Sequence, residues 1–307
     1  MPNLRQLEYL VALADTLHFR RAAERTNTTQ PTLSEQLKAL EERLGTQLVE
    51  RGGSRIVITP VGEQVVTIAR RMLRDAQEIR SIASGSNGLS GLVRLAVPQT
   101  IGPYLFKHAA PLLQQAYPDL QLNVREDTAQ KLPRCLEEGH VDLIILPGPV
   151  RAAEIVTVPL FREPLMLTVS AKHPLAAPGT VRLKDLKGQQ VLTLAQGHYL
   201  HESVQPLCSE AGATLRYDFE GTSLDMLREM VIMGLGVTFM PGLYAARELV
   251  NDPAVRVMRI ADRNLYRTVF MGWRKSSGRQ EAFLDMAEFF RRVARSIPEV
   301  ARTESTA

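Results

Sequence analysis

Apolar residues in the N-terminal region recur every three or four positions, which is the spacing of amphipathic helices. This pattern predicts one helix over Leu4–Ala14 and a shorter helix over Phe19–Thr26. A third helix is predicted over Gln30–Leu44, because Thr29 is a favourable N-cap, a proline is tolerated in the first turn, and Gly45 can close the C-terminus.

A hairpin and a long helix follow these three helices. Two β-prone runs, Leu48–Glu50 and Ile56–Ile58, flank a Gly-Gly-Ser turn, and three helices followed by such a wing predict a winged helix-turn-helix. Thr59 and Pro60 then start a helix that is predicted to end near Ile82. Its narrow apolar stripe is typical of a coiled-coil seam, so we expect it to pair with its copy in a second subunit. The alternative is that it packs onto its own domain.

The pattern changes after Ser84–Gly91, a Gly/Ser/Asn-rich linker that marks a domain boundary. Strand-like runs then alternate with helical stretches, which predicts parallel α/β sheets. The expected strands are Leu92–Val97, Gln121–Arg125, Val141–Leu146, Leu165–Ser170, Val191–Leu194, Leu215–Phe219, Val237–Met240 and Leu265–Trp273, and the expected helices include Tyr104–Ala116, Gln130–Glu138, Ser223–Met233 and Gln280–Arg295.

Composition narrows the class of protein without deciding it. The 307 residues are 45% hydrophobic and 23% charged, which is ordinary for a globular chain of about two domains. The longest apolar runs are far shorter than the roughly 20 residues of a membrane-spanning helix, and the N-terminus lacks the pattern of a secretory signal. We therefore expect a cytoplasmic protein that makes no membrane contact.

Candidate DNA-binding residues are identified by their placement, because the net charge is only +4 and acidic and basic residues nearly balance in residues 1–60. In a helix-turn-helix, the start of the second helix faces base edges in the major groove. Side-chain amides and hydroxyls can read those edges, whereas neighbouring hydroxyl and basic groups suit phosphates. The alternative is that these side chains are only caps and solvated surface. Expected base contacts come from Gln30, Thr32 and Ser34 with Pro31 in the same turn, and expected phosphate contacts come from Thr28, Thr29, Lys38, Arg51 and Arg55.

Four segments of this region resemble the LysR family of bacterial transcription regulators: Phe19–Glu24, Thr29–Glu41, Leu44–Arg51 and Thr59–Gly62. The family architecture covers essentially the whole chain. The resemblance implies a winged helix-turn-helix domain at 1–60, a linker dimerisation helix and hinge at 61–90, and an effector-sensing domain at 91–307. This last domain would have the two-lobed fold of type-II periplasmic binding proteins, with lobe I at about 91–162 and 267–307, and lobe II at about 163–266.

The same resemblance implies the partners of the protein. Members of the family bind double-stranded DNA as homodimers or homotetramers, respond to a small-molecule effector, and act with RNA polymerase as activators or repressors. No metal or cofactor is predicted, since the sequence has no Cys/His cluster, and its two cysteines, Cys135 and Cys208, are expected to be reduced.

Within the family, the chain resembles the OxyR-type peroxide sensors, for example at Thr100–Tyr104, Pro159–Phe161 and Cys208–Gly212. Those sensors carry a peroxidatic cysteine directly after the histidine that matches His198, and a resolving cysteine at the position of Cys208. This chain has Tyr199 at the first of these positions. A phenol has a pKa near 10 and has no sulfenic-acid or disulfide chemistry, so Cys208 is the one redox candidate that the resemblance leaves.

An effector site is expected in the cleft between the lobes, because open α/β sheets bind ligands at the carboxyl ends of their strands. Several polar residues and one glycine follow predicted strands, and Thr222 precedes a helix start that suits an anion. Each residue alone also has a simpler interpretation as a cap or a surface group. The candidates are Thr100, Thr128, Gly148, His198, Tyr199, Thr222 and Arg267.

The leading hypothesis is a DNA-binding regulator that responds to a non-covalent metabolite. The second is an OxyR-like oxidative-stress regulator that uses Cys208 or acts without the peroxidatic cysteine. A transporter's solute-binding protein shares the sensor fold, but it would need a secretion signal and would not begin with a helix-turn-helix. An enzyme is disfavoured, because no Ser/His/Asp set, metal motif or Gly-rich phosphate loop stands out.

Overall fold

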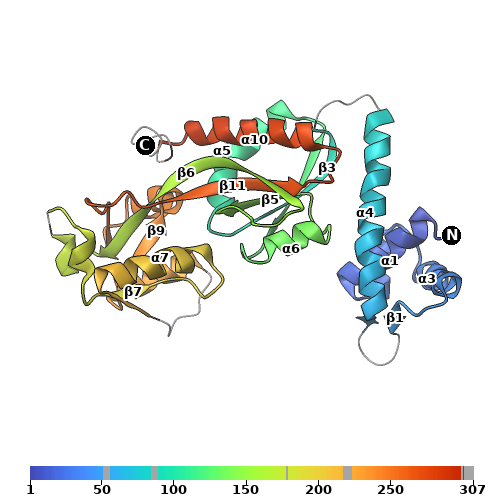
Figure 1. The fold of residues 1–307 in the computed structure, drawn as a ribbon, viewed down its shortest axis with the longest axis horizontal. Coiled ribbons are helices and arrows are strands. Elements are labelled where there is room, and N and C mark those ends of the chain that lie inside the picture. The colour runs from blue at the N-terminus through green and yellow to red at the C-terminus, as the bar shows by residue number, and fades with distance from the viewer. Residues whose placement is uncertain (51–55, 84–88, 178, 217–222, 299, 301–307) are drawn as a thin grey trace. The chain divides into compact units, whose positions relative to one another are not determined.

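The computed structural model describes residues 1–50, 56–83, 89–177, 179–216, 223–298 and 300 (Figure 1). The chain divides into two compact units, one within Met1–Asn87 and the other within Gly88–Glu137 and Val141–Ala307. Three of the predicted site residues, Arg51, Arg55 and Thr222, lie outside the described residues, as does most of the expected linker.

The N-terminal unit is a winged helix-turn-helix, as the sequence predicts. One apolar cluster, which includes Leu10, Leu33, Leu37 and Leu48, joins its helices and its wing. The elements are α1 (Leu4–Thr16), α2 (Phe19–Arg25), α3 (Gln30–Leu44), the antiparallel wing strands β1 (Val49–Glu50) and β2 (Val57–Ile58), and α4 (Pro60–Ala83).

Local sequence sets both ends of α3. The Thr29 hydroxyl accepts a hydrogen bond from the backbone N–H of Thr32 at 3.4 Å, as expected of an N-cap. Gly45 follows the helix in the left-handed conformation, at φ 66°, where other residues are strained. Both predicted signals are therefore confirmed, and the Thr29 cap fixes which residues form the first turn of α3.

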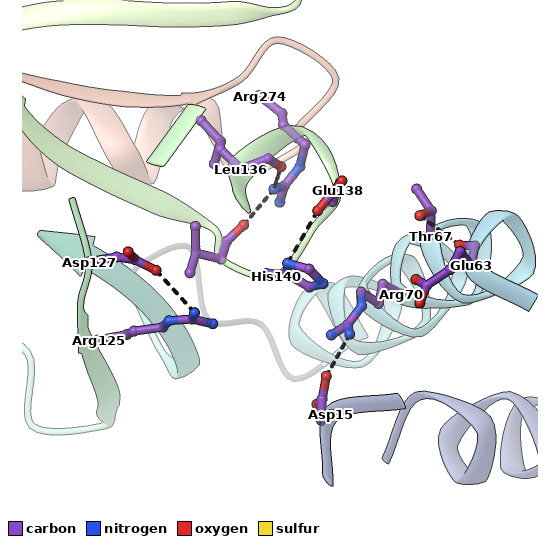
Figure 2. A network of polar contacts seen from close by, with 11 residues as sticks. Asp15, Glu63, Thr67, Arg70, Arg125, Asp127, Leu136, Glu138, His140 and Arg274 are labelled. Carbon is purple, nitrogen blue, oxygen red and sulfur yellow. Dashed lines mark hydrogen bonds and ion pairs between the residues drawn. The ribbon is translucent and has the colours of Figure 1, made fainter. Parts of the chain in front are cut away.

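An ion pair and a close backbone contact attach α4 to the rest of its unit. Arg70 Nη2 lies 2.5 Å from Asp15 Oδ1 at the end of α1 (Figure 2). The same carboxylate holds Arg25 of α2 at 2.8 Å. At Gly62, a Cβ atom would come within 2.3 Å of the Leu48 carbonyl oxygen, so this approach requires a glycine. One face of α4 therefore does pack onto its own unit, which sequence reasoning treated only as the alternative.

The second unit is built on a mixed sheet (Figure 1). Among the described residues, nine strands hydrogen-bond in the order β4-β3-β5-β11-β6-β9-β7-β8, with β10 on β6. They are β3 (Gly91–Val97), β4 (Leu120–Glu126), β5 (Leu143–Pro147), β6 (Ile155–Ser170), β7 (Gln190–Leu192), β8 (Thr214–Leu215), β9 (Val237–Pro241), β10 (Val255–Met258) and β11 (Tyr266–Arg274).

The sheet forms two lobes that β6 connects. Ile155–Pro164 of β6 pairs with β11 in lobe I, and Leu165–Ser170 pairs with β9 and β10 in lobe II. Each lobe has its own apolar core, one around Trp273 and the other around Phe239. The helices are α5 (Gly102–Ala116), α6 (Leu132–Glu137), α7 (Tyr199–Ala211), α8 (Leu224–Ile232), α9 (Gly242–Tyr244) and α10 (Gln280–Arg295), with short turns η1 (Pro174–Ala176), η2 (Leu183–Leu186) and η3 (Ala245–Leu249).

The prediction of parallel sheets is wrong for the centre of this unit. Strand β3 is parallel to β4 and β5, and β7 is parallel to β8 and β9. The two long strands β6 and β11 pair antiparallel with each other, and each pairs antiparallel with its other neighbours. The reason is that the chain passes between the lobes along β6 and returns at β11, so these strands run in opposite directions.

Arg274 of β11 holds the loop that follows α6 in the same lobe. Its Nη1 donates to the carbonyl oxygens of Leu136 and Val141 at 2.6 and 2.5 Å (Figure 2). Its Nη2 lies 3.4 Å from Asp142 Oδ1. The guanidinium of Arg274 thus pairs with a carbonyl group at the C-terminus of α6, where unpaired carbonyl groups favour a positive charge.

Candidate functional site

The first turn of α3 presents a row of polar side chains to solvent. The hydroxyls of Thr29 and Thr32 share a hydrogen bond at 2.8 Å. Farther along the helix, Lys38 is exposed and lies 3.7 Å from Glu42, a pair that water weakens enough to leave the lysine available to a phosphate. Of the predicted DNA contacts in this turn, the exposed residues are Thr29, Gln30, Pro31 and Thr32, and the half-buried ones are Thr28 and Ser34.

Two contacts that sequence reasoning missed position this surface. Arg5 Nη2 donates to the carbonyl oxygen of Thr26 at 2.6 Å, in the turn before α3. Glu41 Oε1 accepts hydrogen bonds from the backbone N–H groups of Leu48 and Val49, at 2.9 and 3.0 Å, where the wing begins. No local pattern predicts either contact, because Arg5 and Thr26 are separated by 21 positions, and Glu41 lies seven and eight positions before its two partners.

Arg267 and Thr100, two of the predicted effector residues, belong to one buried cluster. Arg267 is 1% exposed, and its Nε lies 2.6 Å from Glu163 Oε1. Its Nη1 and Nη2 donate to the hydroxyl and the carbonyl oxygen of Thr100 at 3.1 and 2.7 Å. The other oxygen of Glu163 accepts from the backbone N–H of Leu243 at 3.0 Å. The guanidinium charge is therefore already neutralised within the protein.

Tyr199 and Gly148, which sequence reasoning assigned to one site, are in contact. Gly148 follows β5 of lobe I with φ +80°, and a Cβ atom there would lie 2.7 Å from Cε2 of Tyr199 at the start of α7. A second close approach joins the lobes nearby: a Cβ atom on Gly197 would lie 2.5 Å from Oε1 of Gln130. Gln130 was not predicted as a site residue, because Gly197, which it contacts, is far away in the sequence.

His198 precedes Tyr199 as the N-cap residue of α7, and its side chain makes no capping hydrogen bond. It is 9% exposed, and burial lowers the pKa of its imidazole below the ordinary value. Because the ordinary value is already about 6.5, the ring is neutral at pH 7. A neutral ring offers one donor and one acceptor to a ligand.

The remaining predicted residues lie in turns. Thr128 follows β4, and its backbone N–H donates to Asp127 Oδ1 at 2.9 Å. At the start of α8, Ser223 caps the helix by accepting from Met226 N at 3.5 Å. The carboxylate of Asp225 in the same turn accepts a hydrogen bond from the buried Tyr244 hydroxyl at 2.9 Å. This helix start, where an anion was expected, therefore already carries a carboxylate.

Neither cysteine is in a disulfide, and the two thiols belong to different apolar clusters. Cys208 is 4% exposed in the core of lobe II, and Cys135 is half-buried against a cluster of lobe I. Burial raises the pKa of the Cys208 thiol to about 11. Since the thiolate is the reactive form, Cys208 is a poor nucleophile at pH 7.

The described part of the chain contains neither a metal-binding cluster nor a membrane-spanning helix. No group of three or more His, Cys, Asp or Glu side chains could hold a metal ion there. Within the same residues, no helix is long and apolar enough to cross a membrane.

Two family models match the chain. The one described as "Bacterial regulatory helix-turn-helix protein, lysR family" matches residues 4–63, and the one described as "LysR substrate binding domain" matches residues 86–295. The chain therefore belongs to the LysR family and is a DNA-binding transcription regulator.

Individual relatives narrow the resemblance to the OxyR type, as the sequence predicted. The DNA-binding transcriptional dual regulator OxyR of Escherichia coli (strain K12) is 37% identical over 290 residues, which cover 94% of this chain and 95% of that protein. The HTH-type transcriptional regulator EstR of Acinetobacter baylyi is 31% identical over 298 residues, covering 97% and 99%. Among solved structures, full-length OxyR of Pseudomonas aeruginosa with a cysteine-to-aspartate substitution has a TM-score of 0.79 at 35% identity, covering 95% and 98%.

The Glu163–Arg267 cluster leads to a prediction about stability. Arg267→Met should lower the free energy of unfolding of the sensing unit by about 3–5 kcal/mol, because it leaves the Glu163 carboxylate buried without a countercharge. The double change Glu163→Met with Arg267→Met should cost clearly less than the sum of the two single changes. Urea unfolding followed by the fluorescence of Trp273, the single tryptophan, reports on this unit.

Arg247→Met is the matched control, because that arginine pairs with Glu248 at 2.8 Å but is 42% exposed, and its loss should cost at most about 1 kcal/mol. Equal costs for the Arg267 and Arg247 changes, or an additive double change at the cluster, would contradict the assignment.

Proposed function

We propose that this regulator binds a dyad-symmetric promoter site in the cytoplasm as a homodimer, or as a tetramer of two such dimers, and acts there with RNA polymerase. The observation that carries the proposal is the combination of an exposed polar turn on α3 with an exposed apolar stripe on α4 of the same unit. Pairing of two α4 helices would present two α3 helices to one face of the duplex. Because the relatives are transcription regulators, we propose no catalytic activity.

The stripe on α4 supports pairing with a second copy. On one face, Val66 and Ala69 are 2% and 1% exposed. The other face carries large apolar side chains that are 43% to 68% exposed and are spaced by seven, four and seven residues, as in a coiled-coil seam. An apolar stripe of this kind is stabilised when a second helix covers it. Its members are Val61, Ile68, Met72 and Ile79.

For the signal, we infer a small metabolite that binds between the lobes without forming a covalent bond. Tyr199 stands where the resemblance places a peroxidatic cysteine, and its ring lies against Gly148 of the other lobe. The remaining candidate thiol, Cys208, is buried in an apolar core with a pKa of about 11. A ligand could therefore act on the Tyr199–Gly148 contact between the lobes, whereas the Cys208 thiol is not activated for attack.

The alternative is an oxidative-stress regulator that uses Cys208 or acts without a peroxidatic cysteine. What favours it is the relatives: a protein of Escherichia coli O157:H7 that is 37% identical over 290 residues is named a hydrogen peroxide-inducible genes activator. A cysteine-to-serine variant of Corynebacterium glutamicum OxyR, with a TM-score of 0.68 and 30% identity, has been solved in an H2O2-bound form.

The α3 surface predicts different effects for base-facing and phosphate-facing residues. Gln30→Ala should weaken binding to the promoter site by about 1–3 kcal/mol and relax the preference at one base pair, because the carboxamide can bond a base edge in two places. Lys38→Ala should weaken binding to all sequences alike and reduce the slope of the salt dependence by about one unit. Footprints and salt titrations on the full chain measure both effects.

The footprint itself should show two half-sites on one face of the duplex, separated by about one helical turn or a multiple of it. A single asymmetric contact would reject pairing through α4, and identical effects of the two substitutions would reject the placement of α3 in the major groove.

The arrangement of thiols predicts that peroxide does not act on this protein by the disulfide route. Modest peroxide should leave the intact mass, the free-thiol count and the promoter footprint of the purified chain unchanged, because Tyr199 cannot attack peroxide and Cys208 is mostly protonated. Tyr199→Cys should gain a peroxide-dependent change in footprint, and Tyr199→Phe is its control. Formation of a Cys135–Cys208 bridge with a changed footprint in the unaltered protein would favour the alternative.

A further inference from the structure

Asp15 is a carboxylate at an electrostatically unfavourable place in α1. It stands in the last turn of that helix, where unpaired carbonyl groups carry partial negative charge and disfavour a second negative group. The same turn contains no basic residue that could offset it. Compensation for its charge therefore comes from other helices. Asp15 was not among the residues that the sequence singled out.

Two arginines from two other helices supply that compensation. Asp15 Oδ1 lies 2.5 Å from Nη2 of Arg70 in α4 (Figure 2). The other oxygen, Oδ2, lies 2.8 Å from Nη1 of Arg25, the last residue of α2. The side chains of Asp15 and Arg70 are only 20% and 11% exposed, so water screens this pair less than an exposed one. One carboxylate thus joins α1, α2 and α4.

The pair with Arg70 lies farther along α4 than the contacts that this helix makes at Gly62 and Val66. Gly62 approaches the Leu48 carbonyl oxygen closely, and Val66 belongs to the apolar cluster of the helix-turn-helix. Arg70 is about two helical turns, roughly 12 Å, beyond Gly62. Contacts at separated points fix the direction of a helix, whereas a contact at one point lets it swing. The Asp15–Arg70 pair therefore helps to fix the direction of α4 relative to α1.

That direction matters because the apolar stripe for a second copy lies on the same helix. Met72 and Ile79, the exposed members of the stripe beyond Arg70, would pair with the α4 helix of the second copy. The angle between α4 and its own helix-turn-helix then determines how far apart the two α3 helices lie. Displacing α3 by about 3.4 Å along the duplex corresponds to one base-pair step. A change in that angle would therefore change which separation of half-sites fits the dimer.

We propose that Asp15, through Arg70 and Arg25, determines the spacing between half-sites that this regulator accepts. Asp15 lies at the end of α1, outside the turn of α3 that we propose to contact base edges. It would thus select the architecture of the promoter site and leave the sequence of each half-site to α3. This inference rests on the proposed function, since a spacing has meaning only for a dyad-symmetric site that a dimer binds.

A series of DNA duplexes tests this inference on the full chain. Two half-sites, taken from the footprint, are separated by lengths that differ by single base pairs, and a further duplex carries a single half-site. The unaltered chain should prefer one spacing and bind its neighbours several-fold more weakly. Asp15→Asn keeps the size of the side chain and removes its charge, so it should flatten this preference several-fold or shift it by a base pair, with unchanged affinity for the single half-site. Arg70→Met should have the same effect, and the double change should not exceed either single change, because both remove one contact.

Two control variants separate an effect on spacing from effects on charge and on DNA contact. Glu24→Gln makes the same chemical change in a residue whose exposed ion pair with Arg20, at 3.1 Å, lies within α2, so the spacing preference should be retained. Lys38→Ala should weaken binding to the single half-site and to every spacing alike. The Asp15 and Lys38 changes should therefore have opposite signatures.

Several results would overturn the inference. They are an unaltered chain that has no preferred spacing, a preference that Asp15→Asn and Arg70→Met leave unchanged, the same flattening in Glu24→Gln, and a uniform loss of affinity that includes the single half-site. Dissociation of either variant in sedimentation would also overturn it, because the contact would then support pairing itself and not the angle. A footprint of the unaltered chain without a dyad would instead refute the proposed function, so the two failures are distinguishable.

Discussion

The ion pair between Glu163 and Arg267 is the contact on which the arrangement of the sensing unit depends most. The two residues are register partners on β6 and β11, the strands at the crossover between the lobes. Through their remaining hydrogen bonds they also hold Thr100 before α5 and Leu243 in α9. Because a buried charge without its partner is costly, these contacts hold the four positions together. The crossover is therefore the base from which the segments before α5 and in α9 are positioned.

On that base, the boundary between the lobes is closed by packing rather than by sulfur chemistry. The ring of Tyr199 fills the space beside Gly148, and the carboxamide of Gln130 fills the space beside Gly197. Glycine is required at both positions, because φ is positive and a side chain would collide with the opposite lobe. Cys208 instead contributes to the apolar core of lobe II. A signal that changes these contacts would alter how the lobes close without any covalent step.

Local signals explain what the sequence could predict. Thr29, a proline in the first turn and Gly45 delimit α3 correctly, and the Gly-Gly-Ser turn between β-prone runs indicates the wing. Contacts between distant residues were not predictable in this way. The partner of Arg267 lies 104 positions away, so the arginine was read as a free ligand group although its charge is already neutralised. The first half of β6 was likewise missed, because the strand was predicted only over Leu165–Ser170 and the antiparallel pairing of Ile155–Pro164 with β11 has no local pattern.

We propose that this regulator reads its signal without a thiol, and a cysteine-free chain tests that proposal most directly. Because the sequence has only two cysteines, Cys135→Ser with Cys208→Ala removes every thiol. Promoter occupancy and transcription of the adjacent genes would be compared between this variant and the unaltered protein across growth conditions, including peroxide stress. We expect the same occupancy and the same changes in transcription for both proteins. A variant that is present at normal levels and still binds DNA, but whose transcription no longer changes with conditions, would contradict it.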